Sequence, residues 1–331
     1  MDLPTTISNG YSRSSGADKS ATRSNSSSRA RIRLQLYPLK SKLVLPGDSI
    51  TVRLTEALAS AKLGVKNGDI IAIASKVVSL SEGNVVSLAK VKPSISARRL
   101  ASRFGVPPEF VQVVLDESDA VYGGVPGVLL TLKNGDAVAN SGVDRKNAPV
   151  ESVIPWPVNP QRSAEKIRRI ISRKFRKKVG VVIVDSRVTP LRLGTIGLAI
   201  ACSGFQPVRD ARGMTDLYGR KVLMTLQSLA DGIAGAAHML MGETRETIPF
   251  VLVRSAPVKL AGKREGSMTL PVKDCLYMSQ MPSPLLEKPL LRREGQSLRP
   301  PSPGEYLLSG SDYGRDRRFR AQSRLGSDGV L

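Results

Sequence analysis

The sequence predicts a fold in which buried strands and amphipathic helices share one core. The run VGVVIV at residues 179–184 is apolar throughout, which indicates a strand covered on both faces, because a half-exposed strand would alternate with polar residues. Residues 160–175 repeat apolar side chains at helical spacing, and an Asn-Gly pair at 134–135 separates two apolar runs, as in a hairpin. With 41% hydrophobic residues among 331, the chain can build its core from both kinds of element.

Polar segments flank the predicted folded part. Residues 1–33 are rich in Ser, Arg and Thr, and from 263 to 331 the periodicity is lost among Pro, Ser, Gly and Arg. We expect a disordered leader (1–33), a folded domain (34–262) and a disordered tail (263–331). The leader has the composition of a transit peptide, so targeting to an organelle is the alternative to a cytoplasmic location.

The first predicted elements lie before residue 80. Alternating polar and apolar residues at 31–37 predict a half-buried strand. The apolar residues of 50–63 share one face of a helix. An apolar run that starts at Ile70 predicts a second buried strand, which ends at Ser75 and Lys76.

Two helices and a hairpin follow. The helices are predicted at 96–104 and 107–117, separated at Gly105, with proline at the start of the second. Their periodic Leu, Phe and Val residues indicate packing against a core. The arms of the hairpin are predicted at 127–132 and 136–142, on either side of the Asn-Gly turn.

The last part of the predicted fold begins with a basic helix. Asn159 and Pro160 suit its cap and its first helical position. Beyond the 179–184 strand, a polar loop is predicted at 209–222. It precedes a helix of small residues at 226–242 and a last strand at 249–254.

Charge and composition narrow the classes of function. The net charge is +22, and residues 161–178 hold nine Lys or Arg against Glu165 alone. Such a surface attracts nucleic acid, anionic membrane and phosphorylated substrates alike, although a solvated helix face is the simpler interpretation. A single histidine, His238, excludes a three-histidine zinc site, and we assign it no role. Two separated cysteines offer no disulfide framework, and no apolar run approaches the roughly 20 residues that span a bilayer.

Three short segments combine acidic, basic, hydroxyl and amide side chains. Carboxylates and hydroxyls bind hard metal ions, and cations beside them can hold the phosphate oxygens that such ions bridge. The simpler interpretation is a set of turn carboxylates and solvated cations. No P-loop or dinucleotide fingerprint occurs in the sequence. The three groups are Ser75 with Lys76; Asp144, Arg145 and Asn147; and Asp185 and Ser186 at a strand end, with Arg187 and Arg192 in the loop predicted to follow.

Five segments, in order and spacing, resemble the coenzyme F420-0:L-glutamate ligase family: GDIIAIASKVVSLSEG, NSGVDRKNAP, VVIVDSRVTPLRLGTIGLAI, RDARGMTDLYGR and AAHMLMGE. The resemblance covers residues 34–259. It implies a two-lobed α+β fold with mixed β-sheets, a homodimer, and GTP-dependent attachment of L-glutamate to the deazaflavin precursor F420-0. The acceptor carboxylate would become an acyl phosphate, which the amine of glutamate attacks.

The resemblance also implies roles for individual residues. Asp144, Asp185 and Ser186 match positions that bind a divalent metal, here Mg²⁺ or Mn²⁺. Ser75 and Asn147 match positions that contact the guanine nucleotide. Three basic residues are our own candidates for phosphate contact, the last of them grouped with the two aspartates as catalytic: Lys76, Arg145 and Arg192.

The chain departs from the family pattern at several places. Ser186 stands where threonine is typical, and Leu80 stands where many members carry a basic side chain that helps to hold nucleotide. KSKL at 40–43 occupies the place of a nucleotide loop of the form GIPE, and VDSRVTPLRLG replaces the more usual SDTFGRPWR form. These differences predict an altered nucleotide pocket in a divergent branch.

Two alternative functions follow. The altered loops are compatible with the same ligase chemistry on a folate- or pterin-like acceptor. From another class, a non-enzymatic RNA-binding protein would use residues 161–178 and the tails. The predicted metal carboxylates argue against RNA, because without an ion they would repel phosphate. We therefore expect small-molecule substrates, with no membrane or nucleic-acid partner.

Overall fold

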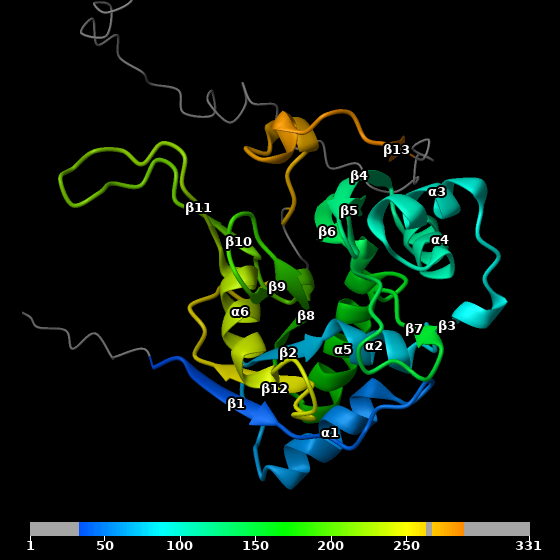
Figure 1. Cartoon of the computed structure of the whole chain (residues 1–331). Coiled ribbons are helices and arrows are strands. Elements are labelled where there is room, and N and C mark those ends of the chain that lie inside the picture. The colour runs from blue at the N-terminus through cyan, green and yellow to red at the C-terminus, as the bar shows by residue number, and fades with distance from the viewer. Residues whose placement is uncertain (1–32, 263–266, 288–331) are drawn as a thin grey trace, which may run out of the picture. The chain divides into compact units, whose positions relative to one another are not determined.

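The computed structural model describes residues 33–262 and 267–287 (Figure 1). The predicted leader and most of the predicted tail lie outside the described residues, and the three predicted region boundaries remain predictions. Residues 267–287 differ from the expected disorder. They contain two 3-10 turns and a short strand, β13 (Leu286–Glu287), which pairs antiparallel with β4 (Ala120–Val125). Elements this short have no periodicity that a sequence pattern could reveal.

The larger sheet has five strands in the order β1-β12-β2-β8-β9. The central pair, β2 and β8, is parallel, and the other neighbours are antiparallel, so the sheet is mixed. Its strands are β1 (Gln35–Leu39), β12 (Phe250–Arg254), β2 (Ile70–Ala74), β8 (Gly180–Val188) and β9 (Thr195–Ser203). The predicted buried strands are thereby confirmed, and β1 begins later than expected.

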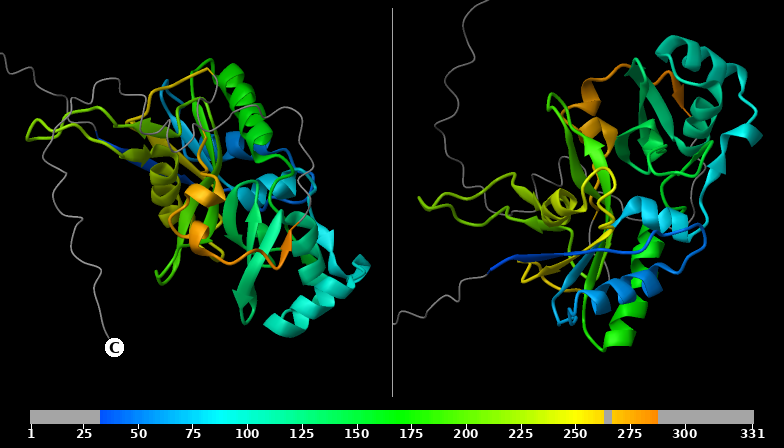
Figure 2. Two further views of the ribbon diagram at one scale, coloured as in Figure 1. Left: turned by 90° about the horizontal axis from the view of Figure 1, so that it is seen from above. Right: turned by 60° about the horizontal axis from the view of Figure 1, so that its bottom comes forward.

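Helices cover both faces of this sheet (Figure 2). α1 (Ile50–Ser60) and α5 (Pro160–Phe175) pack on one face, and α6 (Leu229–Met241) packs on the other. Alternate residues of β8 therefore enter different cores: Val181 and Ile183 face α1 and α5, whereas Val182 and Val184 face α6. This double burial is the physical reason for the uninterrupted apolar run.

A four-stranded sheet of order β13-β4-β5-β6 carries its own core. β5 (Val128–Lys133) and β6 (Asp136–Ala139) form the predicted hairpin, and both turn residues, Asn134 and Gly135, have positive φ. The predicted helices α3 (Ile95–Phe104) and α4 (Pro108–Glu117) pack on this sheet. The α+β class with mixed sheets is confirmed.

The remaining short elements position loops. α2 (Ser75–Ser81) follows β2 directly, and β3 (Val86–Ser87) pairs with β7 (Ser152–Val153). β10 (Val208–Asp210) and β11 (Leu226–Ser228) form the base of an arm, residues 208–228, that projects from the sheet in Figures 1 and 2. No described helix is long and apolar enough to cross a membrane.

Helix caps explain where two helices begin. The Asn159 side chain accepts a hydrogen bond from the Arg162 N–H at 2.9 Å, as predicted for α5. α6 begins at Leu229 rather than at the predicted 226, because the Ser228 hydroxyl caps it by accepting from the Asp231 N–H at 3.3 Å. The three residues before the helix belong to β11.

A buried ion pair joins the start of β2 to the end of β12. Asp69 is 1% exposed, and the Arg254 guanidinium donates to its two oxygens from Nε at 2.9 Å and from Nη2 at 2.8 Å. The Lys66 N–H also donates to this carboxylate at 2.7 Å.

We predict that Arg254→Met lowers the free energy of unfolding by about 3 kcal/mol, because Asp69 would stay buried without its partner. Urea denaturation measures the loss. The matched control is Arg53→Met, which breaks the more exposed Arg53–Asp48 pair and should cost much less. Equal losses in the two variants would contradict the importance of burial.

Candidate functional site

The candidate site lies at the edge of the large sheet where the parallel strands β2 and β8 end. Ala74 of β2 is in register with Val184 of β8, so Ser75 and Asp185 follow at the same level. β8 does not stop at Asp185 as the sequence predicted. It continues to Val188 because β9 pairs with it, and Asp185 and Ser186 therefore lie within the strand and on opposite faces.

The Asp185 carboxylate is held by two neutral donors. The Ser75 hydroxyl donates to Oδ1 at 2.7 Å, and the Trp156 indole N–H donates to Oδ2 at 3.0 Å. Loss of hydration raises the pKa of Asp185, and the negative charge of Asp144 adds to the rise. The Ser75 hydrogen bond, the charge of Arg187 and the Trp156 hydrogen bond oppose this rise in pKa only in part.

Asp144 approaches from the segment between the two sheets. Its backbone exchanges hydrogen bonds with Ile154, and its Oδ2 lies 2.7 Å from the Lys76 ammonium. The Lys146 N–H donates to its Oδ1 at 2.7 Å. The structure thus places Ser75 against Asp185 and Lys76 against Asp144, and the metal role of the two aspartates remains a prediction.

A third carboxylate, Glu243, meets Ser186 on the other side of β8. The hydroxyls of Ser186 and Thr195 donate to its Oε1 at 2.5 and 2.6 Å, and Lys146 Nζ lies 3.0 Å from its Oε2. His238 Nε2 is 3.0 Å from the same Oε1. Burial alone would raise the pKa of Glu243, but the donors and the Lys146 charge outweigh it and lower the pKa to about 2.

Sequence reasoning missed Glu243 and gave His238 no role. The available signal was the segment AAHMLMGE, which ends in Glu243 and was the only resembling segment besides RDARGMTDLYGR without a candidate residue. Close packing of α6 on β9 places Glu243 beside Ser186. A Cβ on Gly197 of β9 would lie 2.4 Å from the His238 Cβ, so only glycine permits this approach.

Arg187 has a structural position rather than the predicted loop position. It is 6% exposed in β8, its Nη2 donates to the Ala137 carbonyl at 2.5 Å, and its guanidinium lies 5.4 Å from the Trp156 ring centre. Trp156 is fixed from its other side by Gly142, where an added Cβ would meet the indole nitrogen at 2.1 Å. Arg187 therefore positions the indole that contacts Asp185.

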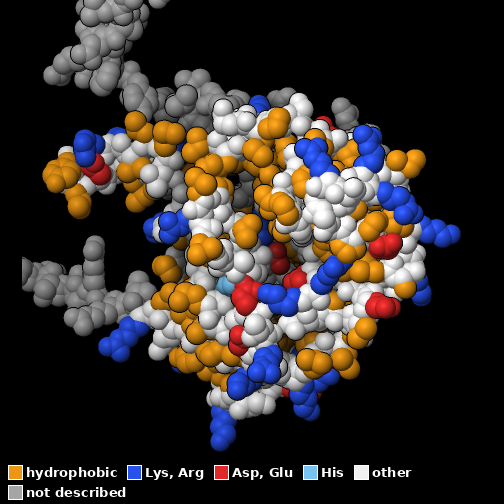
Figure 3. All heavy atoms as spheres, in the orientation of Figure 1, with side chains coloured by type: hydrophobic (Ala, Val, Ile, Leu, Met, Phe, Trp, Pro, Cys, Tyr) orange, Lys and Arg blue, Asp and Glu red, His pale blue; other side chains and the backbone are white. Residues whose placement is uncertain are grey.

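The other predicted site residues lie at different distances from Asp185 and Glu243. Asn147 Nδ2 donates to the Thr244 carbonyl at 2.9 Å, which places it beside Glu243. The Arg145 guanidinium stacks on Phe110, 4.4 Å from the ring centre. Arg192 lies exposed between β8 and β9, and among the described residues its side chain makes no ion pair. Acidic and basic side chains gather near the middle of the face in Figure 3, where Figure 1 labels β8 and α2.

The two altered loops have separate explanations. Leu80 is 7% exposed and packs with Val44 and Ile154 in a small apolar cluster, so an apolar side chain suits its surroundings. The KSKL segment at 40–43 is a loop, and the Ser41 N–H donates to the Thr247 carbonyl at 2.9 Å. This contact ties the expected nucleotide loop to the segment that follows Glu243.

The donor set is compatible with a hard divalent cation. In the described part of the chain, no group of three or more His, Cys, Asp and Glu side chains is arranged to hold a metal ion. The oxygen donors instead form two pairs on opposite faces of β8: Asp185 with Asp144, and Ser186 with Glu243. Mg²⁺ is usually held by one or two carboxylates with water and substrate phosphates, so an open oxygen set fits it.

The chain is similar in sequence to a known protein family and to several named proteins. A family model described as F420-0:Gamma-glutamyl ligase matches residues 38–255. The chain is 38% identical over 238 residues to the coenzyme F420:L-glutamate ligase of Archaeoglobus fulgidus, covering 72% of this chain and 92% of that protein. It is 39% identical to the proteins of the same name from Methanococcus maripaludis strain S2 and Methanopyrus kandleri, covering 69% of this chain and 90% and 89% of those proteins.

We predict that Glu243→Gln removes part of the pH dependence of unfolding measured without divalent metal. The folded pKa of about 2 lies below the ordinary 4.5, so ionised Glu243 stabilises the fold above its ordinary pKa, and this stability is lost as the pH falls towards 2. The difference in urea midpoint between wild type and variant should therefore be largest above about pH 5 and should vanish at the acid end.

Thr195→Val is the companion variant, because it removes one of the donors to Glu243. Introducing Glu243→Gln into the Thr195→Val variant should change the urea midpoint less than it does in wild type, but the pH-dependent change should not disappear. A difference between wild type and Glu243→Gln that stays constant with pH would contradict the assigned pKa shift.

Proposed function

We propose that the chain, which belongs to the F420-0:gamma-glutamyl ligase family and is a ligase that forms carbon–nitrogen bonds, joins L-glutamate to the carboxylate of F420-0. The observation that carries the proposal is that the matched span, 38–255, contains every residue of the oxygen-rich site around Asp185. The relatives are themselves named coenzyme F420:L-glutamate ligases, and the match covers 89% to 92% of their lengths.

The reaction we propose uses GTP as co-substrate. An oxygen of the acceptor carboxylate bonds to the γ-phosphorus while the bond from that phosphorus to the β–γ bridging oxygen breaks, and GDP leaves. The amine of L-glutamate then attacks the acyl carbon of the resulting acyl phosphate. Inorganic phosphate departs, the nitrogen loses a proton, and the amide remains.

Asp144, Asp185 and Ser186 would hold the Mg²⁺ or Mn²⁺ ion, with Glu243 as an additional oxygen donor. The support is that these groups are acidic or hydroxylic, that Asp144 is near enough to raise the pKa of Asp185, and that Lys146 contacts both Asp144 and Glu243. When bound, the metal neutralises negative charge on the phosphoryl group that is transferred.

The remaining site residues would hold the nucleotide. Ser75 and Asn147 would contact the guanine nucleotide, and three cations would contact its phosphates. Lys76 has the strongest support, because its ammonium already reaches Asp144 at 2.7 Å and can turn to a phosphate oxygen. Arg145 would have to leave the Phe110 ring, and Arg192 is exposed on its loop, so both would move to act.

A second molecule is a candidate for the acceptor substrate. Leu80 lies in an apolar cluster instead of presenting a cation, and the 40–43 loop has its own sequence, so the pocket differs from the usual pattern. A folate- or pterin-like carboxylate is the alternative acceptor. Labelled glutamate, GTP and Mn²⁺ supplied with either acceptor would separate the two, because only the true acceptor gives labelled amide. RNA binding, the alternative without catalysis, has the weaker support.

We also propose that two copies of the chain associate through the arm at 208–228. The arm exposes large apolar side chains: Leu217 and Tyr218 at its tip are 100% and 84% exposed, and Met224 nearer its base is 82% exposed. Clustered apolar side chains of this size usually mark an interaction surface, and a second copy is the commonest partner. We propose a cytoplasmic location because Cys202 and Cys275 are not joined in a disulfide.

Asp144→Asn and Asp185→Asn should each lower ligase turnover by about a hundredfold or more, because each removes a charge that the metal requires. Both variants should keep the wild-type circular dichroism. Glu109→Gln, a charge change on α4 outside the site, is the control and should turn over normally. Near-normal turnover in either aspartate variant would refute these roles.

Leu217→Ser combined with Met224→Ser should convert a dimer into monomers, because both replace fully or largely exposed apolar side chains of the arm. Light scattering after size-exclusion chromatography measures the mass. Leu191→Ser with Leu193→Ser, on the exposed loop between β8 and β9, is the matched control. A wild-type monomer, or a dimer in the arm variant, would contradict the proposed interface.

A further inference from the structure

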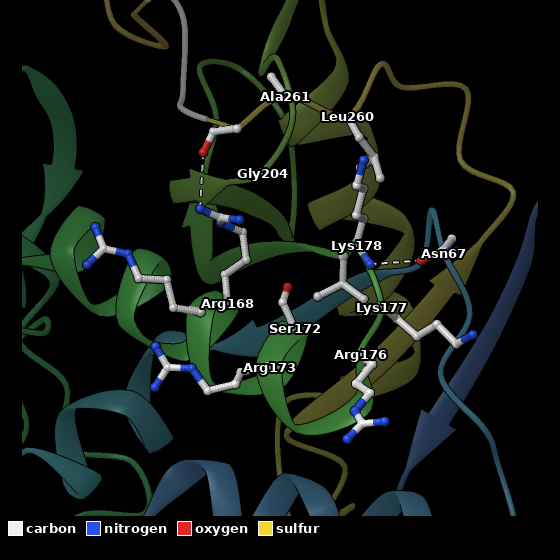
Figure 4. Close-up of a pocket in the computed structure, with 13 residues that line it drawn as sticks. Asn67, Arg168, Ser172, Arg173, Arg176, Lys177, Lys178, Gly204, Leu260 and Ala261 are labelled. Carbon is white, nitrogen blue, oxygen red and sulfur yellow. Dashed lines mark hydrogen bonds between the residues drawn. The ribbon is translucent and has the colours of Figure 1, made fainter.

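A basic pocket of about 930 Å³ lies where α5 ends and β8 begins (Figure 4). Its walls come from α5, from the turn that follows it, and from the chain beside Gly204 and Leu260. None of the described residues that line it is Asp or Glu. Six of its lining residues are cations: Arg168, Arg169, Arg173, Arg176, Lys177 and Lys178.

The basic pocket is separate from the site around Asp185. Val179, which lines the pocket, comes immediately before β8, and Asp185 is six residues further along the chain. A strand advances about 3.3 Å per residue, so roughly 20 Å of strand lies between them. A ligand of the pocket would therefore occupy the opposite edge of the sheet from the ligase site.

Most of the positive charge in the pocket is uncompensated. Arg168 donates to the Ser203 hydroxyl at 2.8 Å and to the Gly262 carbonyl at 3.1 Å, and Arg169 lies 3.6 Å from Glu165. The other four cations make no ion pair among the described residues. A helix C-terminus favours cations in its last turn. In Figure 4 the Arg173, Arg176 and Lys177 side chains point in different directions around the end of α5, so an anion would have to draw their charged ends together.

The frame of the pocket is well defined. Asn67 Oδ1 accepts from the Lys178 N–H at 2.8 Å, and Arg176 turns the chain with a φ of 53°. A Cβ on Gly204 would meet Arg168 Cδ at 2.6 Å, so glycine lets that side chain lie along the wall. The Ser172 hydroxyl, shielded from solvent, has no hydrogen-bond partner among the described residues, and in Figure 4 it lies between Arg168 and Lys178.

We propose that the basic pocket binds a small anion carrying several phosphate groups. Its volume falls in the range of small-molecule sites, roughly 300 to 1,000 Å³. Guanidinium groups bind phosphate through paired hydrogen bonds, and four of the six cations that line the pocket are arginines. No aromatic side chain from the part of the chain that the structure describes lines the pocket, and aromatic side chains are the stacking surface by which proteins hold single-stranded nucleic acid.

The test is isothermal titration of the full chain with inorganic tripolyphosphate, in EDTA and about 0.15 M salt, where long-range attraction is screened. We expect one saturable site. Arg173→Gln, Lys177→Gln and Lys178→Gln together should weaken binding by about tenfold or more, because they remove charge-assisted contacts. The matched control, Lys92→Gln, Arg98→Gln and Arg99→Gln, removes the same charge from exposed positions elsewhere and should change affinity less than about twofold.

Arg173→Gln alone provides a second test, since glutamine keeps α5 helical while removing one guanidinium, and it should weaken binding several-fold. Ligase turnover should be normal in all these variants, which separates the pocket from the ligase site. Three results would overturn the proposal: no saturable binding, equal weakening in the pocket and control variants, or preferential binding of single-stranded RNA over tripolyphosphate.

Discussion

The partly buried carboxylate of Asp185 is the group on which the site depends. It loses hydration at the sheet edge, and the Ser75 hydroxyl and the Trp156 indole replace that hydration with hydrogen bonds. Trp156 lies against Arg187, which donates in turn to the Ala137 carbonyl in the smaller sheet. One acidic group is therefore connected to both sheets. Its hydrogen bonds and those of its neighbours fix the positions of β6, β8 and the start of α2 relative to one another.

Strand alternation places two chemically different carboxylates around β8. Asp185 points to one face, where burial and Asp144 raise its pKa. Ser186 points to the other face and donates to Glu243, whose pKa is lowered by several donors. The two carboxyl groups thus have opposite preferences for the proton. A hard divalent cation beside Asp185 would relieve its repulsion with Asp144.

Helix α5 contributes to two parts of the molecule through different faces. Its apolar side chains, including Ala164, Ile167 and Ile171, pack on the large sheet. Its cations and the turn after it line the basic pocket at the opposite edge from Asp185. The proposed ligase site and the proposed anion site therefore lie at opposite ends of the sheet. A substitution in one site does not touch residues of the other.

The sequence by itself determined the α and β character, the starts of α5 and the buried strands, the hairpin turn and the family, because periodicity, caps and motifs are local. Tertiary structure decided the rest. β8 runs past Asp185 only because β9 pairs with it, and Arg187 is buried only because the smaller sheet covers it. Glu243 joins Ser186 across 57 residues, and Ser75 joins Asp185 across 110. Contacts of such separation leave no periodic pattern, since they depend on how whole elements pack.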